Sequence, residues 1–153
     1  MKEIEKKFLL TSLPNDLFHY PYEKIIQGYI ATDPVIRLRK SNDHYFLTIK
    51  TSGHLQREEV DLPLTAEQFQ SLWSKVDHMV ILKTRYLIPL ENDLTAEVDI
   101  YHEELDGLVT VEVEFDSVKE AEAFHPPAWF GKDVTHDNRY KNNNLALYGK
   151  PSK

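Results

Sequence analysis

Charged residues of one sign recur two positions apart along most of this chain, and their types suit a binding or catalytic site. Glu3 and Glu5 precede Lys7 at the N-terminus. The same spacing returns further on, with the other members at Arg37, Arg39, Lys50, Arg57, Glu59, Lys83, Arg85, Glu97, Asp99, Glu112 and Glu114. Residues two apart in a β-strand share a face and lie about 6.5–7 Å apart. Because like charges repel at that distance, the repeated grouping predicts a ligand of opposite charge.

The set contains acids and bases in equal numbers, seven of each. Carboxylates bind hard divalent cations such as Mg²⁺ and Mn²⁺. Arg and Lys bind phosphate oxygens, and Arg often does so with two parallel hydrogen bonds. Seven cations exceed what one phosphate monoester requires, and they match a phosphate chain with roughly four or five negative charges bridged by metal. The residue types therefore predict a site for a metal–polyphosphate complex.

These residues must be positioned by strands, because most of the chain alternates polar and apolar residues with a period of two. Short turns rich in Asp, Asn, Gly and Pro separate the alternating segments and favour antiparallel hairpins. The expected strands are residues 2–10, 24–30, 35–40, 44–51, 57–62, 81–90, 95–101 and 109–115. Eight antiparallel strands are enough to close a barrel that admits one small ligand. An open, cupped sheet would place the same groups on one concave face, so the alternation alone allows both.

The opposite face of each expected strand is apolar, and three predicted helices are its natural cover. Residues 65–80 begin with a capping box of Thr65 and Gln68, and residues 117–124 begin with a similar pattern. A third helix is expected over about residues 137–148, which includes the polar run KNNN at residues 141–144. The predicted fold class is mainly β (α+β), with a closed eight-stranded antiparallel barrel, a charged lumen and helices packed outside. All 153 residues are expected to form one domain.

Composition narrows the class of protein further. Hydrophobic residues make up 41% of the chain and charged residues 28%, as in a soluble globular protein. The net charge of −7 disfavours general nucleic-acid binding. No apolar run approaches the roughly 20 residues of a membrane span, no secretory signal is visible, and the chain has no cysteine. We therefore expect a cytoplasmic protein, monomeric or homodimeric, with neither membrane nor nucleic-acid partners.

The ordered charge pattern resembles the CYTH superfamily, also called triphosphate tunnel metalloenzymes, in a short bacterial-type form. The N-terminal signature E-x-E-x-K is matched by Glu3, Glu5 and Lys7. Further matches cover nearly the whole chain: QGY at residues 27–29, R-x-R at 37–39, Lys50, R-E-E at 57–59, K-x-R at 83–85, E-x-D at 97–99, E-x-E at 112–114 and the region of residues 133–142. The single E-x-E-x-K motif is weakly specific, whereas the ordered set is strongly so.

The resemblance implies a role for each matching position. It implies metal ligation of Mg²⁺ or Mn²⁺ by Glu3, Glu5, Glu59, Asp99, Glu112 and Glu114. It implies phosphate binding by Lys7, Arg37, Arg39, Lys50, Arg57, Lys83 and Arg85. Lys7, Glu97 and Asp99 are the candidate catalytic residues. Neighbouring carboxylates stabilise the charged form of a lysine, so we favour Lys7 as a positioner of phosphate or water rather than as a base.

The expected function is metal-dependent hydrolysis of a small-molecule triphosphate, either inorganic tripolyphosphate or a nucleoside or thiamine triphosphate. A first alternative is a class IV-type adenylate cyclase that converts ATP to cAMP, although no ribose or base pocket is visible in the sequence. RNA 5′-triphosphatase activity is a related option. A second alternative is a module that binds polyphosphate or nucleotide without turnover, which would not need the acidic set. The seven histidines show no zinc spacing, and Tyr140 is either a core aromatic or a cap at a tunnel mouth.

Overall fold

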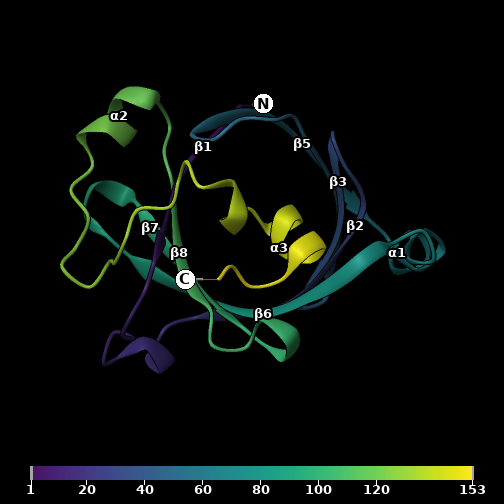
Figure 1. Ribbon diagram of the computed structural model, residues 1–153, viewed down its shortest axis with the longest axis horizontal. Helices are drawn as coiled ribbons and strands as arrows, with labels where there is room; N and C mark the ends of the chain where they lie inside the picture. Colours follow the sequence, from purple (N-terminus) through teal and green to yellow (C-terminus); the bar gives the residue numbers. More distant parts are fainter. Residues whose placement is uncertain (1, 153) are drawn as a thin grey trace.

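The computed structural model describes residues 2–152, apart from the side chains of residues 78 and 79, and is organised around one β-barrel (Figure 1). Eight antiparallel strands close it in the order β1-β5-β4-β3-β2-β6-β7-β8. The strands are β1 (Lys2–Leu9), β2 (Tyr22–Thr32), β3 (Val35–Ser41), β4 (His44–Lys50), β5 (Gln56–Leu64), β6 (Asp77–Pro89), β7 (Thr95–Tyr101) and β8 (Val109–Glu114). The predicted mainly β fold class with a closed antiparallel barrel is confirmed.

Strand β1 closes the barrel because its two halves pair with different neighbours. Its first residues pair with β5, so that Glu3 lies opposite Arg57. Its later residues pair with β8, so that Glu5 lies opposite Glu114. The open, cupped sheet that the alternation also allowed is therefore not formed, and seven of the eight strands, all except β2, turn charged side chains toward one interior.

Strand β6 is the element whose predicted boundary was wrong. It begins at Asp77 rather than at residue 81, and α1 (Ala66–Trp73) ends well before residue 80. The capping box at the start of α1 is present as predicted. The residues after α1 include the β-branched Val76 and Val80, which suit a strand better than a helix. Pairing of Asp77 with Tyr29 on β2 extends β6 into the segment assigned to the helix.

A glycine on β2 allows the end of α1 to pack closely against the barrel. A Cβ atom built on Gly28 would lie 2.6 Å from Val76 Cγ1 and 3.1 Å from the Trp73 ring. Any larger residue would push this segment away from the outer face of β2. The close approach fixes the point at which α1 turns into β6.

Two of the three apolar clusters among the described residues lie outside the barrel wall, as the alternation predicted. The outward side chains Phe8, Val98 and Val111 are at most 3% exposed. They pack with the loop that follows α2 (Val118–Ala123), in which Phe130 lies against Phe8 at a ring-centroid distance of 4.9 Å. Helix α2 covers the neighbouring part of β1 and β8, so α1 and α2 both lie outside the barrel (Figure 1).

The C-terminal segment differs from the expectation that every helix packs outside. The single helix predicted over residues 137–148 is a short 3-10 turn (Asn138–Tyr140) followed by α3 (Asn142–Tyr148). Figure 1 shows α3 within the ring of strands. Its apolar residues pack against inward side chains of β2, β6 and β7, and this cluster includes Tyr29, Ile81, Tyr101, Leu145 and Ala146. Helix α3 therefore closes one end of the barrel. No helix within residues 2–152 combines the length and apolar character that crossing a bilayer requires.

Candidate functional site

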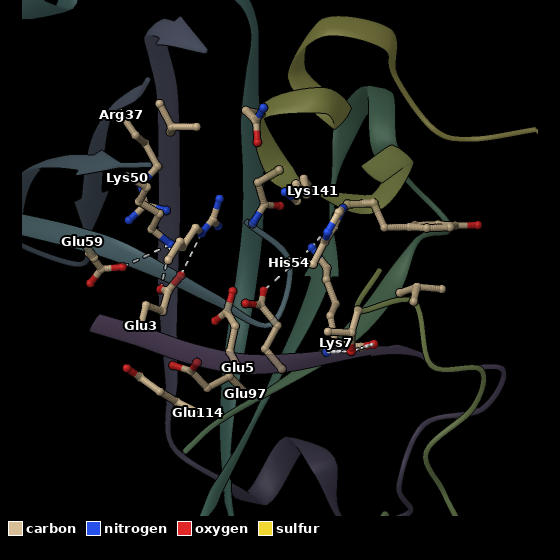
Figure 2. A pocket seen from close by; sticks show the side chains of 18 of the residues that line it. Glu3, Glu5, Lys7, Arg37, Lys50, His54, Glu59, Glu97, Glu114 and Lys141 are labelled. Atoms are coloured by element: carbon tan, nitrogen blue, oxygen red, sulfur yellow. Dashed lines mark hydrogen bonds and ion pairs between the residues drawn. The ribbon is translucent and has the colours of Figure 1, made fainter. Parts of the chain in front are cut away.

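A cavity of about 200 Å³ lies inside the barrel and is lined mainly by charged side chains (Figure 2). All of the predicted site residues line it except Lys83 and Asp99. Those that do are Glu3, Glu5, Lys7, Arg37, Arg39, Lys50, Arg57, Glu59, Arg85, Glu97, Glu112 and Glu114. Figure 2 shows Glu5, Glu97 and Glu114 grouped beside β1. Acids and bases that are far apart in the sequence therefore surround one enclosed space.

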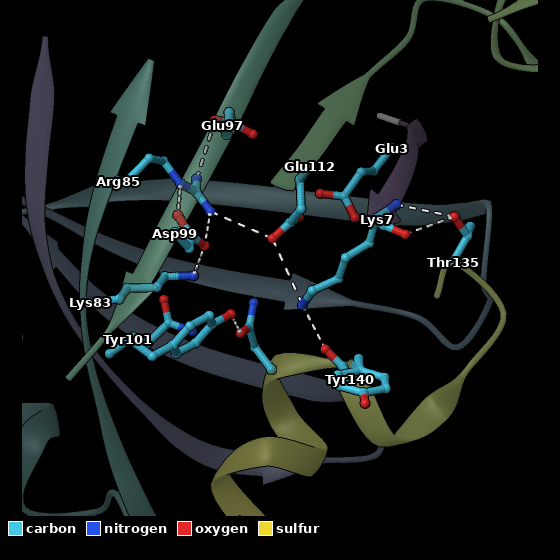
Figure 3. A network of polar contacts seen from close by, with 12 residues as sticks. Glu3, Lys7, Lys83, Arg85, Glu97, Asp99, Tyr101, Glu112, Thr135 and Tyr140 are labelled. Atoms are coloured by element: carbon cyan, nitrogen blue, oxygen red, sulfur yellow. Dashed lines mark hydrogen bonds and ion pairs between the residues drawn. The ribbon is translucent and has the colours of Figure 1, made fainter. Parts of the chain in front are cut away.

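Lys7 reaches the cavity because the C-terminal segment holds β1 on its free side. The Lys7 backbone N–H donates to Thr135 Oγ1 at 3.1 Å, and the Val134 N–H donates to the Lys7 carbonyl at 2.8 Å. The Lys7 ammonium donates to the Tyr140 carbonyl at 2.6 Å and lies 3.9 Å from Glu112 Oε1 (Figure 3). Tyr140 itself lines the cavity next to α3 and also packs against the apolar cluster that contains Leu145, so both interpretations of this residue stay open. Lys7 is thus anchored at the junction of β1 and the C-terminal segment.

Four side chains of β1, β4 and β5 form what we call the outer cluster: Glu3, Lys50, Arg57 and Glu59. Lys50 Nζ lies 2.8 Å from Glu3 and 3.2 Å from Glu59, and Arg57 Nε donates to Glu3 at 3.1 Å. Burial disfavours the charged form of Glu3, but Lys50 and other partners hold its pKa well below the usual value. Burial and a hydrogen bond with Glu3 raise the pKa of Glu59 to about 7. The two neighbouring carboxyl groups therefore have pKa values shifted in opposite directions.

Three side chains of β6 and β7 form what we call the inner cluster: Lys83, Arg85 and Asp99. Asp99 lies 2.7 Å from Lys83 Nζ and accepts from Arg85 at 2.8 and 3.0 Å (Figure 3). Burial lowers the pKa of Lys83, and the nearby Asp99 carboxylate opposes that shift. Burial acts against ionisation of Asp99, but Arg85 and then Lys83 lower the pKa of this carboxyl.

Two predicted site residues of the inner cluster lie away from the cavity. Lys83 was predicted to bind phosphate and Asp99 to act in metal binding and catalysis, yet neither lines the cavity. Their side chains are 0% exposed and they pair with each other. Arg85 does line the cavity and also donates to Glu97 at 3.2 Å. Lys83 and Asp99 thus lie behind Arg85, one layer away from the space that a ligand would occupy.

Carboxylates of β1 and β8 supply the oxygen atoms that a divalent cation would need. Burial and the neighbouring Glu112 raise the pKa of Glu5 well above the usual value. Glu112 Oε1 is buried without a hydrogen-bond partner in residues 2–152, with Arg85 at 3.7 Å and Lys7 at 3.9 Å. Burial opposes ionisation of Glu112, and Lys7 and Arg85 lower its pKa. A buried, ionised carboxylate oxygen without a hydrogen bond suits a hard cation such as Mg²⁺ or Mn²⁺.

The carboxylates do not by themselves complete a metal centre. Within residues 2–152, no three His, Asp or Glu side chains converge closely enough to hold an ion. Mg²⁺ is commonly held by one or two carboxylates together with substrate phosphates and water, rather than by an all-protein cage. The donor set therefore fits a cation that arrives with phosphate oxygens.

The basic wall on β3 contains two guanidinium groups without carboxylate partners among residues 2–152. Arg37 donates to Thr48 Oγ1 at 3.2 Å, while its Nε is buried with no hydrogen-bond acceptor. Arg39 Nε donates to Gln27 Oε1 at 3.0 Å. Burial, with the nearby charge of Arg37, lowers the pKa of Arg39 to about 10. A bound anion would supply both the acceptor and the counter-charge that this wall lacks.

Several lining residues were missed by the sequence interpretation. Asp61 lines the cavity and accepts a hydrogen bond from Thr48. Its signal was present, because it continues the period-two pattern of Arg57 and Glu59 along β5. His54 and Lys141 also line the cavity, and they come from a loop and from the C-terminal segment. No alternation marks such positions, so only the fold brings them to the site.

Comparison with known proteins gives consistent matches over nearly the full length. The CYTH domain family model matches residues 1–140. An inorganic triphosphatase from Nitrosomonas europaea is 41% identical over 150 residues, which span 96% of this chain and 98% of that protein. An inorganic triphosphatase from Acetivibrio thermocellus is 37% identical over 151 residues, which span 95% of this chain and 93% of that protein.

Solved structures agree with the barrel architecture. The crystal structure of an inorganic triphosphatase is 38% identical to this chain, with a TM-score of 0.70, and covers 98% of this chain and 97% of its own. A Hippeastrum protein described as an adenylyl cyclase with a dominant triphosphatase activity is 14% identical, with a TM-score of 0.64, over 79% of this chain and 83% of its own. The latter likeness supports the fold alone.

Proposed function

The chain belongs to the CYTH domain family, and from this premise we propose that it is a metal-dependent triphosphatase that hydrolyses inorganic triphosphate. The observation that carries the proposal is one cavity of about 200 Å³, lined by acids and by two guanidinium groups that have no carboxylate partner within residues 2–152. The two inorganic triphosphatases at 41% and 37% identity support the choice of substrate. A purely phosphate-binding module would not need the acidic residues.

The carboxylates proposed to hold Mg²⁺ or Mn²⁺ are Glu5, Glu112 and Glu114, with Glu3 and Glu59 beside them. A bound divalent cation would neutralise phosphate charge and polarise the phosphoryl group and the attacking water. Lys50 and Arg57 pair with Glu3, and they would turn toward phosphate oxygens as the acids engage the cation. The exchange of partners keeps every buried charge compensated in the loaded site.

The cations of the barrel are proposed to hold the phosphate chain and to stabilise its transition state. Arg37 and Arg39 face the cavity without carboxylate partners among residues 2–152, and Arg85 joins them from β6. Water attacks a terminal phosphorus, the P–O–P bond breaks, and negative charge develops on the leaving pyrophosphate. Positively charged donors already in place lower the free energy of that charge.

Two further side chains are proposed to position the reacting groups. Lys7, held by the Tyr140 carbonyl, and Glu97, paired with Arg85, would orient the attacking water and the phosphate that it reaches. Lys83 and Asp99 do not line the cavity, so we propose them as positioning residues that fix the Arg85 guanidinium rather than as direct ligands.

The test is release of phosphate by the purified protein from tripolyphosphate, ATP and thiamine triphosphate, each with Mg²⁺, with Mn²⁺ and with EDTA. We expect metal-dependent release, with the highest kcat/KM for tripolyphosphate. Chromatography of the ATP reaction separates hydrolysis products from cAMP, so cAMP and pyrophosphate would support the cyclase alternative. Absence of release from all three substrates under all conditions would overturn the proposed function.

A further inference from the structure

We propose that the polar run Lys141–Asn144 forms part of a second phosphate-binding subsite beside the main cavity. This inference rests on the proposed triphosphatase function and deepens it. The subsite is a pocket of about 200 Å³ between α3 and the ends of β3 and β4, which we call the lateral pocket. Its ligand class is a single tetrahedral phosphate group, either free or at the end of a longer chain.

The lateral pocket shares its positive charges with the main cavity. Lys50, Arg57 and Lys141 line both spaces. Among the described residues that line the lateral pocket, Asp33 alone is acidic, so cations outnumber acids there. A phosphate in the lateral pocket and a triphosphate in the main cavity would therefore contact the same cations from two sides.

Lys141 has no counter-ion of its own. Its ammonium donates to the Gly53 carbonyl, and no carboxylate within residues 2–152 lies at ion-pair distance from it. Burial and the positive charge of Arg57 lower the pKa of Lys141. A half-buried ammonium beside a guanidinium, without an acid between them, is stabilised by an anion that contacts both.

Neutral hydrogen-bond donors complete the lining of the lateral pocket. Asn144 Nδ2 donates one hydrogen bond to the Asn138 carbonyl at 2.7 Å, and an amide nitrogen has a second N–H to offer. The Ser52 hydroxyl lies on the β4–β5 loop at the other side of the pocket. A hydrogen bond of 2.8 Å between His54 and Asn138 ties that loop to the C-terminal segment. The two sides of the pocket are thus held together without a ligand.

Two sources would supply this phosphate group. Hydrolysis of triphosphate releases orthophosphate, which would occupy the lateral pocket next to the shared cations and inhibit the next turnover. A linear polyphosphate with a fourth phosphate would instead extend from the main cavity into the lateral pocket. Both sources require the same charges and donors, and kinetics distinguishes them.

The experiment compares the wild-type protein with Asn144→Asp, because Asn144 lines the lateral pocket and not the main cavity. The matched control is Asn15→Asp, the same change at an exposed position away from both spaces. Initial rates are measured with tripolyphosphate, with tripolyphosphate plus orthophosphate, and with linear tetrapolyphosphate. We expect the control to match wild type, since a distant charge is screened. Because the two spaces share Lys50, Arg57 and Lys141, we expect Asn144→Asp to raise the KM for tripolyphosphate, by a smaller factor than it weakens the lateral pocket.

If free orthophosphate is the source, Asn144→Asp raises its inhibition constant about fivefold or more. If chain extension is the source, the variant lowers kcat/KM for tetrapolyphosphate by about the same factor. No change in either quantity overturns the subsite. Ser52→Asp, which places the same charge in the pocket from the exposed loop, is used if Asn144→Asp does not fold.

Failure of the proposed function is distinguishable from failure of the subsite. If the wild-type protein hydrolyses none of the phosphates, the proposed function is wrong. Calorimetric titration with orthophosphate then tests the lateral pocket alone. Weaker binding to Asn144→Asp than to Asn15→Asp supports the subsite, while equal binding or no binding to all proteins overturns it.

Discussion

The inner and outer clusters use the same types of charged residue but differ in their access to the cavity. Side chains of the inner pair Lys83 and Asp99 are 0% exposed, while those of Arg57 and Glu59 in the outer cluster are 14% and 22% exposed. All four outer residues line the cavity, and of the inner cluster only Arg85 does. Some ion pairs of this barrel are therefore buried behind the cavity lining, and others lie at the cavity, where a ligand would bind.

This difference follows from the cost of burying charge. Removing one partner of a fully buried pair leaves the other charge uncompensated, which costs far more than removing an exposed pair. The inner pair is thus fixed in place. The outer cluster borders a cavity that a charged ligand can enter, so its partners are exchangeable. The comparison predicts large effects on stability for the inner cluster and effects on ligand binding or turnover for the cavity lining.

The largest expected effect comes from Asp99→Asn, which removes the only carboxylate within ion-pair distance of Lys83 in the part of the chain that the structure describes. Buried Lys83 would lose that partner, while Arg85 would lose one carboxylate and keep Glu97 and Glu112. We expect the free energy of unfolding to fall by about 3–5 kcal/mol. Urea denaturation followed by circular dichroism measures it. Glu59→Gln in the outer cluster is the matched control, for which a change smaller than about 1 kcal/mol is expected. A small loss for Asp99→Asn would remove the distinction between the clusters.

The next largest effect is expected for Glu112→Gln, at a cavity-lining position beside the inner cluster. Glu112 contacts both Lys7 and Arg85 and carries the buried oxygen without a hydrogen-bond partner. We expect metal-dependent turnover to fall about 100-fold or more, as for loss of one preorganised electrostatic contact to the transition state. Stability should be preserved, because Glu112 is one of several clustered acids. Phosphate release across a Mg²⁺ titration and a urea denaturation curve test both statements, and full activity would contradict the metal assignment.

The sequence was sufficient to predict the strands and most of the cavity lining, because alternation determines which face of a strand a residue occupies. Closure of the barrel was predicted from the family resemblance, since alternation also allowed an open sheet. Alternation does not determine how far along the barrel axis that residue lies. Lys83 and Arg85 share a face of β6, as do Glu97 and Asp99 on β7, yet one member of each pair is beside the cavity and the other behind it. The stagger of neighbouring strands makes that difference, and it is a property of the closed barrel.

The C-terminal segment shows the second limit of the sequence interpretation. A C-terminal helix was predicted over about residues 137–148, but its position inside the ring of strands was not. That position depends on contacts between distant residues, such as Val134 with Lys7 and Lys141 with Gly53. Local pattern contains no signal for such pairings, so the lateral pocket was not predictable from sequence.

A smaller effect is expected for Lys7→Met, which tests whether the residue at the junction of β1 and the C-terminal segment positions or transfers protons. We expect kcat/KM for tripolyphosphate to fall about tenfold, with the shape of the pH–rate profile unchanged. If Lys7 were a general base, its replacement would remove one limb of the pH–rate profile. Arg139→Met, at an exposed cation paired with Asp137, is the control and should leave kcat/KM unchanged. Turnover equal to wild type in Lys7→Met would exclude any catalytic role for the residue.

The smallest expected effect concerns the pH dependence of the outer cluster. The pKa of Glu59 is raised to about 7 in the folded protein, chiefly by burial, from an ordinary value of 4.5. Between those two values the folded state binds a proton that the unfolded state lacks, so this carboxyl lowers stability as pH rises toward 7 and leaves a constant penalty above it. Gln cannot ionise but can still donate to Glu3. Glu59→Gln should therefore gain stability relative to wild type between pH 5 and pH 8, by less than about 1 kcal/mol because solvent screens a partly exposed group.

Urea denaturation in EDTA at several pH values measures the stability difference between Glu59→Gln and wild type. The control is Glu23→Gln, which removes a partly exposed carboxylate that accepts a hydrogen bond from Ser41. If the stability difference between Glu59→Gln and wild type is independent of pH, Glu59 is ionised throughout and does not share a proton with Glu3. The outer cluster would then carry a full negative charge on both acids at neutral pH. In that case both carboxylates would be available to bind a cation, and the outer cluster would differ more from the inner pair Lys83 and Asp99, whose side chains are 0% exposed.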